Sequence, residues 1–116
     1  MTPESRLLSQ IRATLGRRED VRLFRNNVGT LRDKDGRYVQ YGLCAGSADL
    51  IGWVTRPVWR ESVQGTVAVF LAIEVKSKTG RVTPEQENFL RVVREAGGIA
   101  GCVRSVDEAL ALVGEP

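Results

Sequence analysis

Three segments of the chain carry apolar residues at the three- and four-residue spacing of an amphipathic helix. Each begins with a hydroxyl residue suited to cap a helix N-terminus, namely Thr2, Thr83 or Ser105. Gly16 and Gly97 follow the first two segments as stop signals. The residues expected to face the core are Leu7, Leu8, Ile11 and Leu15 in the first segment, Phe89, Leu90 and Val93 in the second, and Ala109, Leu110 and Val113 in the third. The pattern therefore predicts three helices.

Apolar or alternating runs between these helices predict strands, because they are bounded by glycine, asparagine and aspartate. The expected strands cover residues 21–28, 38–43, 49–54, 66–76 and 99–104. The stretch 55–65, which contains Pro57, is expected to be an exposed connection. This order of elements predicts an α/β fold, a single domain with a central mixed sheet flanked by helices. In such a sheet, functional residues gather where strand ends diverge.

Length and composition limit the classes of protein that fit. A chain of 116 residues forms one domain with one core. No run approaches the roughly 20 apolar residues of a membrane span, and the N-terminus lacks a signal-peptide pattern. We therefore expect a soluble, cytoplasmic protein with no membrane partner. Cys44 and Cys102 lack the spacing of a zinc or redox motif, and we expect both to be buried, reduced thiols.

The sequence contains no histidine. This absence excludes Ser-His-Asp triads, Cys-His pairs, histidine-based zinc sites and histidine-based nucleases. Carboxylate-held metal ions and lysine chemistry remain as catalytic options. The net charge of +3 permits nucleic-acid binding without requiring it.

An acid and an amine end the apolar run 70–76. Because side chains alternate along a strand, Glu74 and Lys76 project from one face while the apolar residues between them pack on the other. A second carboxylate, Asp49, begins another apolar strand. Two carboxylates can hold a hard divalent cation, and a lysine can contact the attacking water or the scissile phosphate. The same residues are also compatible with a simple Glu74–Lys76 ion pair.

Several short motifs carry a family resemblance. They are Gly46-Ser-Ala-Asp49-Leu-Ile-Gly52, Glu74-Val-Lys76, Thr79-Gly-Arg81, Thr83-Pro-Glu-Gln86, Glu4 in the first helix, Arg25-Asn26-Asn27, and the stretch from Val103 to Glu108. Together they closely resemble the VRR-NUC branch of the PD-(D/E)xK nuclease superfamily over nearly the whole chain. The chain looks like the stand-alone form found in phages and bacteria. The resemblance implies a PD-(D/E)xK-like domain at 1–116 that acts as a divalent-metal-dependent DNA endonuclease in a bacterial or phage-infected cell.

The resemblance also assigns roles to individual residues. Asp49 and Glu74 would ligate Mg²⁺ or Mn²⁺, with the backbone carbonyl of Val75 as a further oxygen ligand. Lys76 would orient the water and stabilise charge on the phosphate.

Two further residues match the catalytic pattern of the family. Glu4 matches its helix-one acid, which completes or borders the metal site, although an acid in a first turn also complements the helix dipole. Gln86 matches the family glutamine, yet Thr83 and Gln86 also form a capping box that needs no catalysis.

Five residues are candidates for DNA contact, and each has an ordinary structural alternative. Arg25 and Asn26 could position a phosphate. Ser47 could line the turn that binds the metal, or it could be an ordinary turn residue. Lys78 and Arg81 follow the catalytic strand, where a substrate backbone could run. Exposed basic residues are, however, usually only solvated.

The partners implied by the resemblance are DNA, often branched as in four-way junctions of DNA repair, and a second copy of the chain. We expect the homodimer interface in the connection 55–65, with Trp59 as its anchor. Trp53 is expected to pack in the core rather than to stack on bases. Two alternatives remain open: a catalytically inactive domain that binds branched DNA, and a small structural subunit with a Glu74–Lys76 ion pair.

Overall fold

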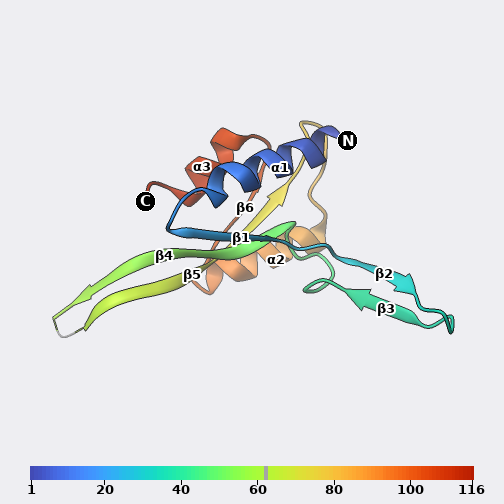
Figure 1. Cartoon of the computed structure of the whole chain (residues 1–116), viewed down its shortest axis with the longest axis horizontal. Coiled ribbons are helices and arrows are strands. Elements are labelled where there is room, and N and C mark those ends of the chain that lie inside the picture. Colours follow the sequence, from blue (N-terminus) through green and yellow to red (C-terminus); the bar gives the residue numbers. More distant parts are fainter. Residues whose placement is uncertain (62) are drawn as a thin grey trace.

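A four-stranded mixed sheet forms the centre of the fold (Figure 1). Its strands lie in the order β1 (Val21–Arg25), β4 (Leu50–Arg60), β5 (Val63–Val75) and β6 (Ile99–Val103). The first three pair antiparallel, whereas β6 lies parallel to β5. The structure is a computed structural model that describes residues 1–61 and 63–116. The predicted α/β class with a mixed sheet is confirmed.

Helices α1 (Pro3–Gly16), α2 (Pro84–Glu95) and α3 (Val106–Val113) begin at the predicted caps. The hydroxyl of Thr2 accepts a hydrogen bond from the backbone N–H of Ser5 at 3.0 Å. Ser105 caps α3 in the same way, through the N–H of Glu108 at 3.0 Å. These bonds satisfy N–H groups that the helices themselves leave unpaired.

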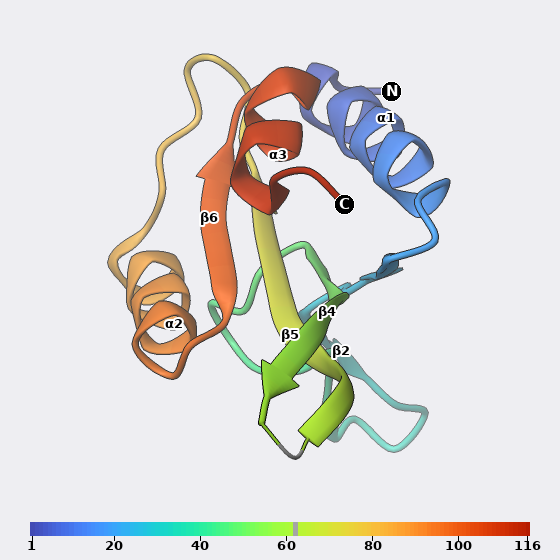
Figure 2. The same ribbon diagram turned by 90° about the vertical axis from the view of Figure 1, so that its left-hand side faces the viewer.

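The helices cover both faces of the sheet. Figure 2 shows α1 and α3 on one side of β5 and β6, and α2 on the other. The larger core lies under α1 and α3, and the smaller one lies under α2. Ala72 and Ala100 allow α2 to approach the sheet closely, with Leu90 packed against them. The larger core contains Leu8, Ile11, Leu15, Val21, Leu23, Leu50, Val54, Leu71, Ile73, Val75, Val103, Ala109 and Val113.

β4 and β5 form a long hairpin that contains residues 55–60 and 63–65, so the predicted exposed connection is wrong for these residues, and Ser62 lies outside the residues that the structure describes. β4 and β5 stay paired from Leu50 opposite Ile73 as far as Arg60 opposite Val63. β1 pairs with β4 only up to Val54, and beyond that point β4 has β5 as its neighbour in the sheet. Pro57 is tolerated there because an edge strand needs no N–H donor on its open side. The side chain of Trp59 on this hairpin is 74% exposed.

A second hairpin stands apart from the main sheet. β2 (Gly29–Arg32) and β3 (Tyr38–Tyr41) pair antiparallel and form a separate two-stranded sheet. Figure 1 shows this hairpin at one end of the molecule and the β4–β5 hairpin at the other. The longest dimension of the protein is 57 Å. We refer to residues 29–41 as the β2–β3 ribbon.

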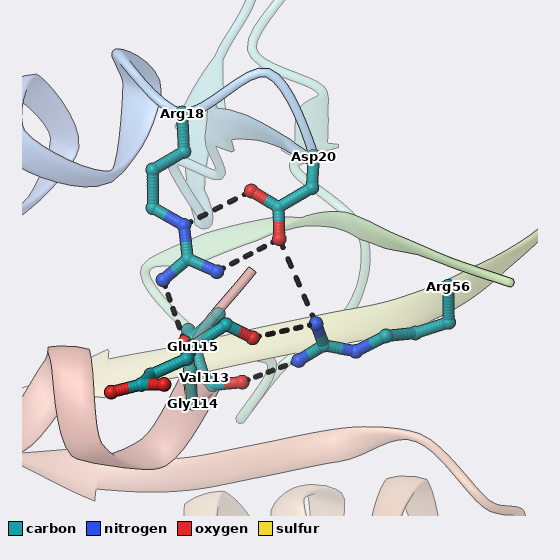
Figure 3. Close-up of polar contacts among 6 residues, drawn as sticks. All are labelled: Arg18, Asp20, Arg56, Val113, Gly114 and Glu115. Carbon is teal, nitrogen blue, oxygen red and sulfur yellow. Dashed lines mark hydrogen bonds and ion pairs between the residues drawn. The ribbon is translucent and has the colours of Figure 1, made fainter.

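A polar cluster fastens the C-terminus to the sheet (Figure 3). Arg18 binds both carboxylate oxygens of Asp20, at 2.8 and 3.0 Å, and donates to the carbonyl of Gly114 at 2.7 Å. Arg56 on β4 donates to the carbonyl of Val113 at 2.6 Å and lies 3.7 Å from Asp20. Arg18 lowers the pKa of Asp20 through this hydrogen bond. The cluster therefore joins the end of α1, the main sheet and the chain end.

Three other expectations can be compared with the fold. Cys44 is exposed, so the prediction that both thiols are buried is wrong, whereas Cys102 is half-buried. Trp53 is 38% exposed and lies 5.8 Å from the ring of Phe24 on the α2 side of the sheet, outside the core. Among the described residues, no helix is long and apolar enough to span a membrane.

Candidate active site

The candidate site is centred on Glu74 near the end of β5. This side chain is only 2% exposed, although it carries a carboxyl group. Its neighbours Ile73 and Val75 point into the core on the opposite face, as the alternation of the strand requires. Lys76 projects on the same face as Glu74, with its Nζ 3.7 Å from Glu74 Oε1. The predicted facing of Glu74 and Lys76 is confirmed.

Asp49 reaches the same place from the neighbouring strand. It lies directly before Leu50, which pairs with Ile73 across the β4–β5 ladder. The Oδ2 atom of Asp49 accepts a hydrogen bond from the backbone N–H of Val75 at 2.9 Å. Strand pairing and this bond together hold the second carboxylate beside the first.

The two carboxyl groups interact strongly. The pKa of Glu74 is raised to about 8, first by burial and then by the negative charge of Asp49 and a hydrogen bond with Asp49. Lys76 acts in the opposite direction, and Glu4 adds a small upward contribution. Near neutral pH the Glu74 carboxyl group therefore keeps its proton beside Asp49. A divalent cation can replace such a proton, because ligand carboxylates must be ionised.

Gln86 links the site to the start of α2. Its side-chain Oε1 accepts a hydrogen bond from the backbone N–H of Thr83 at 2.9 Å. Its backbone N–H donates to the hydroxyl of Thr83 at 3.2 Å. Its Nε2 donates to Glu74 Oε1 at 3.4 Å. The capping box and the contact with the site are therefore both present, and one side chain makes both.

The donor set fits a hard divalent cation. Asp49 and Glu74 supply adjacent carboxylates, and Mg²⁺ is commonly bound by one or two carboxylates together with water and phosphate oxygens. Among the described residues, no three His, Cys, Asp or Glu side chains come together as a ligand group. Glu4 therefore borders the site in this structure without completing a cluster of three acids.

A pocket of about 320 Å³ opens beside the carboxylates. Its lining consists of Arg25, Asn26, Asn27, Val28, Gly46, Ser47, Asp49, Glu74 and Gln86. The pocket is mainly polar, and it joins the end of β1, the turn before β4 and the start of α2. A substrate could reach the carboxylates through this opening.

Asn26 lines the pocket but is only 8% exposed. Its Nδ2 donates to Ser47 Oγ and to the carbonyl of Ala48, each at 2.8 Å, and its Oδ1 accepts from the N–H of Leu43 at 3.0 Å. Its backbone N–H also donates to the carbonyl of Asp49 at 2.7 Å. These partners favour a role in positioning the Asp49 turn over the DNA contact expected from the sequence.

Ser47 is buried in the same turn. Its hydroxyl donates to the carbonyl of Cys44 at 2.6 Å, and the turn-forming alternative therefore accounts for its hydrogen bond. Gly46 before it has a φ of +81°, and an added Cβ would lie 2.9 Å from Cβ of Glu85. A larger residue at Gly46 would strain the turn and push against α2.

The remaining basic candidates are exposed, and of these Arg25 lines the pocket beside the carboxylates. Arg25 is exposed, with its Nε donating to Asn27 Oδ1 at 2.8 Å. Lys78 and Arg81 are exposed in the loop after β5. Lys78 lines a second pocket together with Glu4 and Arg104, and Arg104 is not among the site residues expected from the sequence. Arg104 directly follows β6, and the rule that sites gather at the ends of parallel strands could have identified it.

A comparison with protein families identifies the chain independently of this geometry. The family model described as the VRR-NUC domain matches residues 2–107 of the 116. No curated protein and no solved structure matches the chain. Asp49, Glu74, Lys76 and Gln86 all lie within the matched range. The chain therefore belongs to the VRR-NUC domain family, a family of nuclease type.

Proposed function

We propose that this protein is a divalent-metal-dependent DNA endonuclease that hydrolyses phosphodiester bonds in branched DNA. Membership of the VRR-NUC family supports a nuclease in general, and the geometry of the carboxylates supports the dependence on Mg²⁺ or Mn²⁺. The observation that carries the proposal is the buried Glu74 beside Asp49. A buried acid next to a second acid is unfavourable unless a proton or a cation compensates the charge.

A structural ion pair explains less of the geometry. Glu74 and Lys76 do form an ion pair at 3.7 Å, which is the arrangement of the structural alternative. That pair alone gives no reason for Asp49 to lie against Glu74 and raise its pKa. A cation bound by both acids accounts for all three residues, since Lys76 can then interact with the phosphate.

Each residue of the site has a defined task in this proposal. Asp49 and Glu74 hold the cation, and the carbonyl of Val75 is a further candidate ligand at the strand end. The bound cation would polarise the phosphate and activate water. Lys76 stabilises the charge that develops on the phosphate, and Gln86 orients the Glu74 carboxylate through the contact at 3.4 Å.

A homodimer is part of the proposal, because a four-way junction offers two strands related by an approximate two-fold axis. One chain supplies a single pair of carboxylates, and a symmetric dimer supplies two. Trp59 remains the proposed anchor, and its exposure at the end of the β4–β5 hairpin is compatible with an interface. Light scattering on the wild type and on Trp59→Ala tests it. A Trp59→Ala protein that stays dimeric would refute the placement, and a monomeric wild type would refute the dimer.

A cleavage panel tests the proposed activity. Purified protein is incubated with labelled duplex, flap, splayed and four-way DNA, with and without Mn²⁺. We expect cleavage only with the metal, and most on a branched substrate. Equal cleavage of all substrates would refute the proposed selectivity for branched DNA. Binding without cleavage would favour the alternative of an inactive DNA-binding domain.

A further inference from the structure

The two faces of the β2–β3 ribbon differ in character. The strand register places Thr30 opposite Gln40 and Arg32 opposite Tyr38, so these four side chains share one face. Leu31 and Val39 are paired on the other face, together with Tyr41. The ribbon thus has a hydrogen-bonding face and an apolar face, and every side chain on both is exposed.

The hydrogen-bonding face is ordered by its own contacts. The guanidinium carbon of Arg32 lies 4.8 Å from the centre of the Tyr38 ring, and Arg32 Nη2 donates to the Tyr38 hydroxyl at 2.7 Å. This stacking holds the guanidinium in place while leaving its other N–H groups available. Tyr38 itself is 69% exposed, so the pair is presented to the surroundings rather than packed in the protein.

The tip of the ribbon carries the exposed cations Lys34 and Arg37 and the exposed acid Asp35 on a turn that Asp33 closes. Asp33 Oδ1 accepts hydrogen bonds from the backbone N–H groups of Asp35 and Arg37, each at 2.9 Å. Asp33 therefore closes the turn, and Lys34 and Arg37 extend from it exposed. Exposed lysine and arginine side chains on an arm of a nuclease-family domain are suited to contact phosphate oxygens.

The base of the ribbon is fastened to the candidate active site. Asn26, which holds the Asp49 turn, also binds the N–H of Leu43 just after β3. A pocket of about 280 Å³ at the ribbon base is lined by residues of both ribbon strands and by Val28, and Val28 also lines the pocket that contains Asp49 and Glu74. Gly42 has a φ of +87° here, and its missing Cβ lets the chain pass the backbone of Asn27. The ribbon is therefore continuous with the site.

We propose that the β2–β3 ribbon is a DNA-binding arm. Its hydrogen-bonding face enters the major groove of a duplex beside the scissile phosphate. A two-stranded ribbon fits that groove, and Thr30, Arg32, Tyr38 and Gln40 offer the donors and acceptors that base edges and sugars bind. Lys34 and Arg37, at the tip of the ribbon, contact the phosphate groups that border the groove. This inference rests on the proposed nuclease function, because it requires DNA to lie across the pocket of Asp49 and Glu74.

The test compares salt-dependent DNA binding of two variants that lose the same charge. Lys34→Ala/Arg37→Ala removes the two cations of the ribbon tip. Arg12→Ala/Arg17→Ala removes two exposed cations, one within α1 and one directly after it; Figure 1 shows that the end of α1 that leads into β1 lies away from the ribbon. Binding to labelled duplex and four-way DNA is measured by fluorescence anisotropy with Ca²⁺ in place of a catalytic metal.

We expect the slope of log K against log salt to fall by about 2 in the ribbon variant, one for each phosphate contact, and to stay unchanged in the control. Arg32→Ala should weaken duplex binding roughly tenfold or more, with its thermal unfolding midpoint near that of the wild type. An unchanged slope in the ribbon variant, while the wild type binds and cleaves DNA, would overturn the ribbon proposal alone.

Two further outcomes separate this proposal from its alternatives. If the wild type binds none of the DNA substrates, the proposed function fails and the ribbon proposal fails with it. Light scattering and DNA affinity are also measured together for Leu31→Ser and Lys34→Ala/Arg37→Ala. If either variant changes from dimer to monomer while each chain keeps its affinity for DNA, the ribbon is an interface between copies. That result would contradict the DNA-binding arm.

Discussion

Binding of a divalent cation to the proposed site should release a proton from Glu74. Burial and the neighbouring Asp49 raise the pKa of Glu74 to about 8, compared with an ordinary value of 4.5. At about pH 7, a group with this pKa is roughly nine-tenths protonated. A ligand carboxylate must be ionised, so Mn²⁺ binding at that pH should release about 0.9 proton. The apparent affinity should rise about tenfold between pH 6 and pH 7 and level off above pH 8.

Isothermal titration calorimetry in buffers of different ionisation enthalpy measures this proton directly. Glu74→Gln should abolish the proton release and weaken Mn²⁺ binding, because the titrating ligand is gone. Asp49→Asn should lower the pKa of Glu74, since it removes the like charge beside it. The remaining proton release should then move to lower pH. A wild-type affinity for Mn²⁺ that stays constant between about pH 6 and pH 8 would refute the reasoning.

The same pKa shift has a consequence for stability without metal. The raised pKa means that folded Glu74 binds its proton more tightly than it does in the unfolded chain. Its contribution to the free energy of unfolding is therefore fully present below about pH 4.5 and is lost as the pH rises through about 8. Thermal unfolding in EDTA should accordingly show the wild type losing stability relative to Glu74→Gln as the pH rises across that interval.

Three other changes have defined outcomes. Lys76→Ala should lower turnover by about two to four orders of magnitude while leaving Mn²⁺ and DNA binding nearly intact. Single-turnover rates near those of the wild type would refute the proposed role of Lys76 at the phosphate. Asn26→Ala should destabilise the protein by about 1–3 kcal/mol and lower the cleavage rate more than DNA affinity, as measured by denaturant unfolding and single-turnover kinetics. An Asn26→Ala protein with impaired DNA binding and normal turnover would instead indicate a DNA contact. Asp20→Asn should lower the free energy of unfolding in urea by about 1–3 kcal/mol near neutral pH, and the difference should disappear as the pH falls through the lowered pKa of Asp20. Equal stability of the two proteins near neutral pH would contradict a stabilising role of the polar cluster around Arg18 and Asp20.

Local sequence patterns were sufficient to predict the parts of the fold that depend on neighbouring residues. The helix starts at Thr2, Thr83 and Ser105 follow from capping chemistry, which acts within one turn. The shared face of Glu74 and Lys76 follows from the two-residue period of a strand. Each of these predictions needed only residues close together in the chain.

Contacts between distant segments could not be read in the same way. The bond from the N–H of Val75 to Asp49 depends on the register of β4 against β5, which the sequence does not display. The sequence of residues 55–65 predicts a connection because proline is rare inside sheets, yet β4 beyond Val54 is an edge where Pro57 is tolerated. The hydrogen-bond partners of the Asn26 side chain lie 17 to 22 residues away, and its amide is equally suited to phosphate and to backbone, so its burial was not predictable.

Single-turnover cleavage of a labelled four-way junction in Mn²⁺ tests the central claim most directly, with the wild type compared with Asp49→Asn and Glu74→Gln. Both substitutions nearly preserve side-chain volume and remove one ionised ligand. We predict cleavage by the wild type, no cleavage in EDTA, and no measurable cleavage by either variant although both remain folded and bind DNA. Cleavage at the wild-type rate by either variant would show that the chemistry occurs without these two carboxylates and would contradict the proposed site.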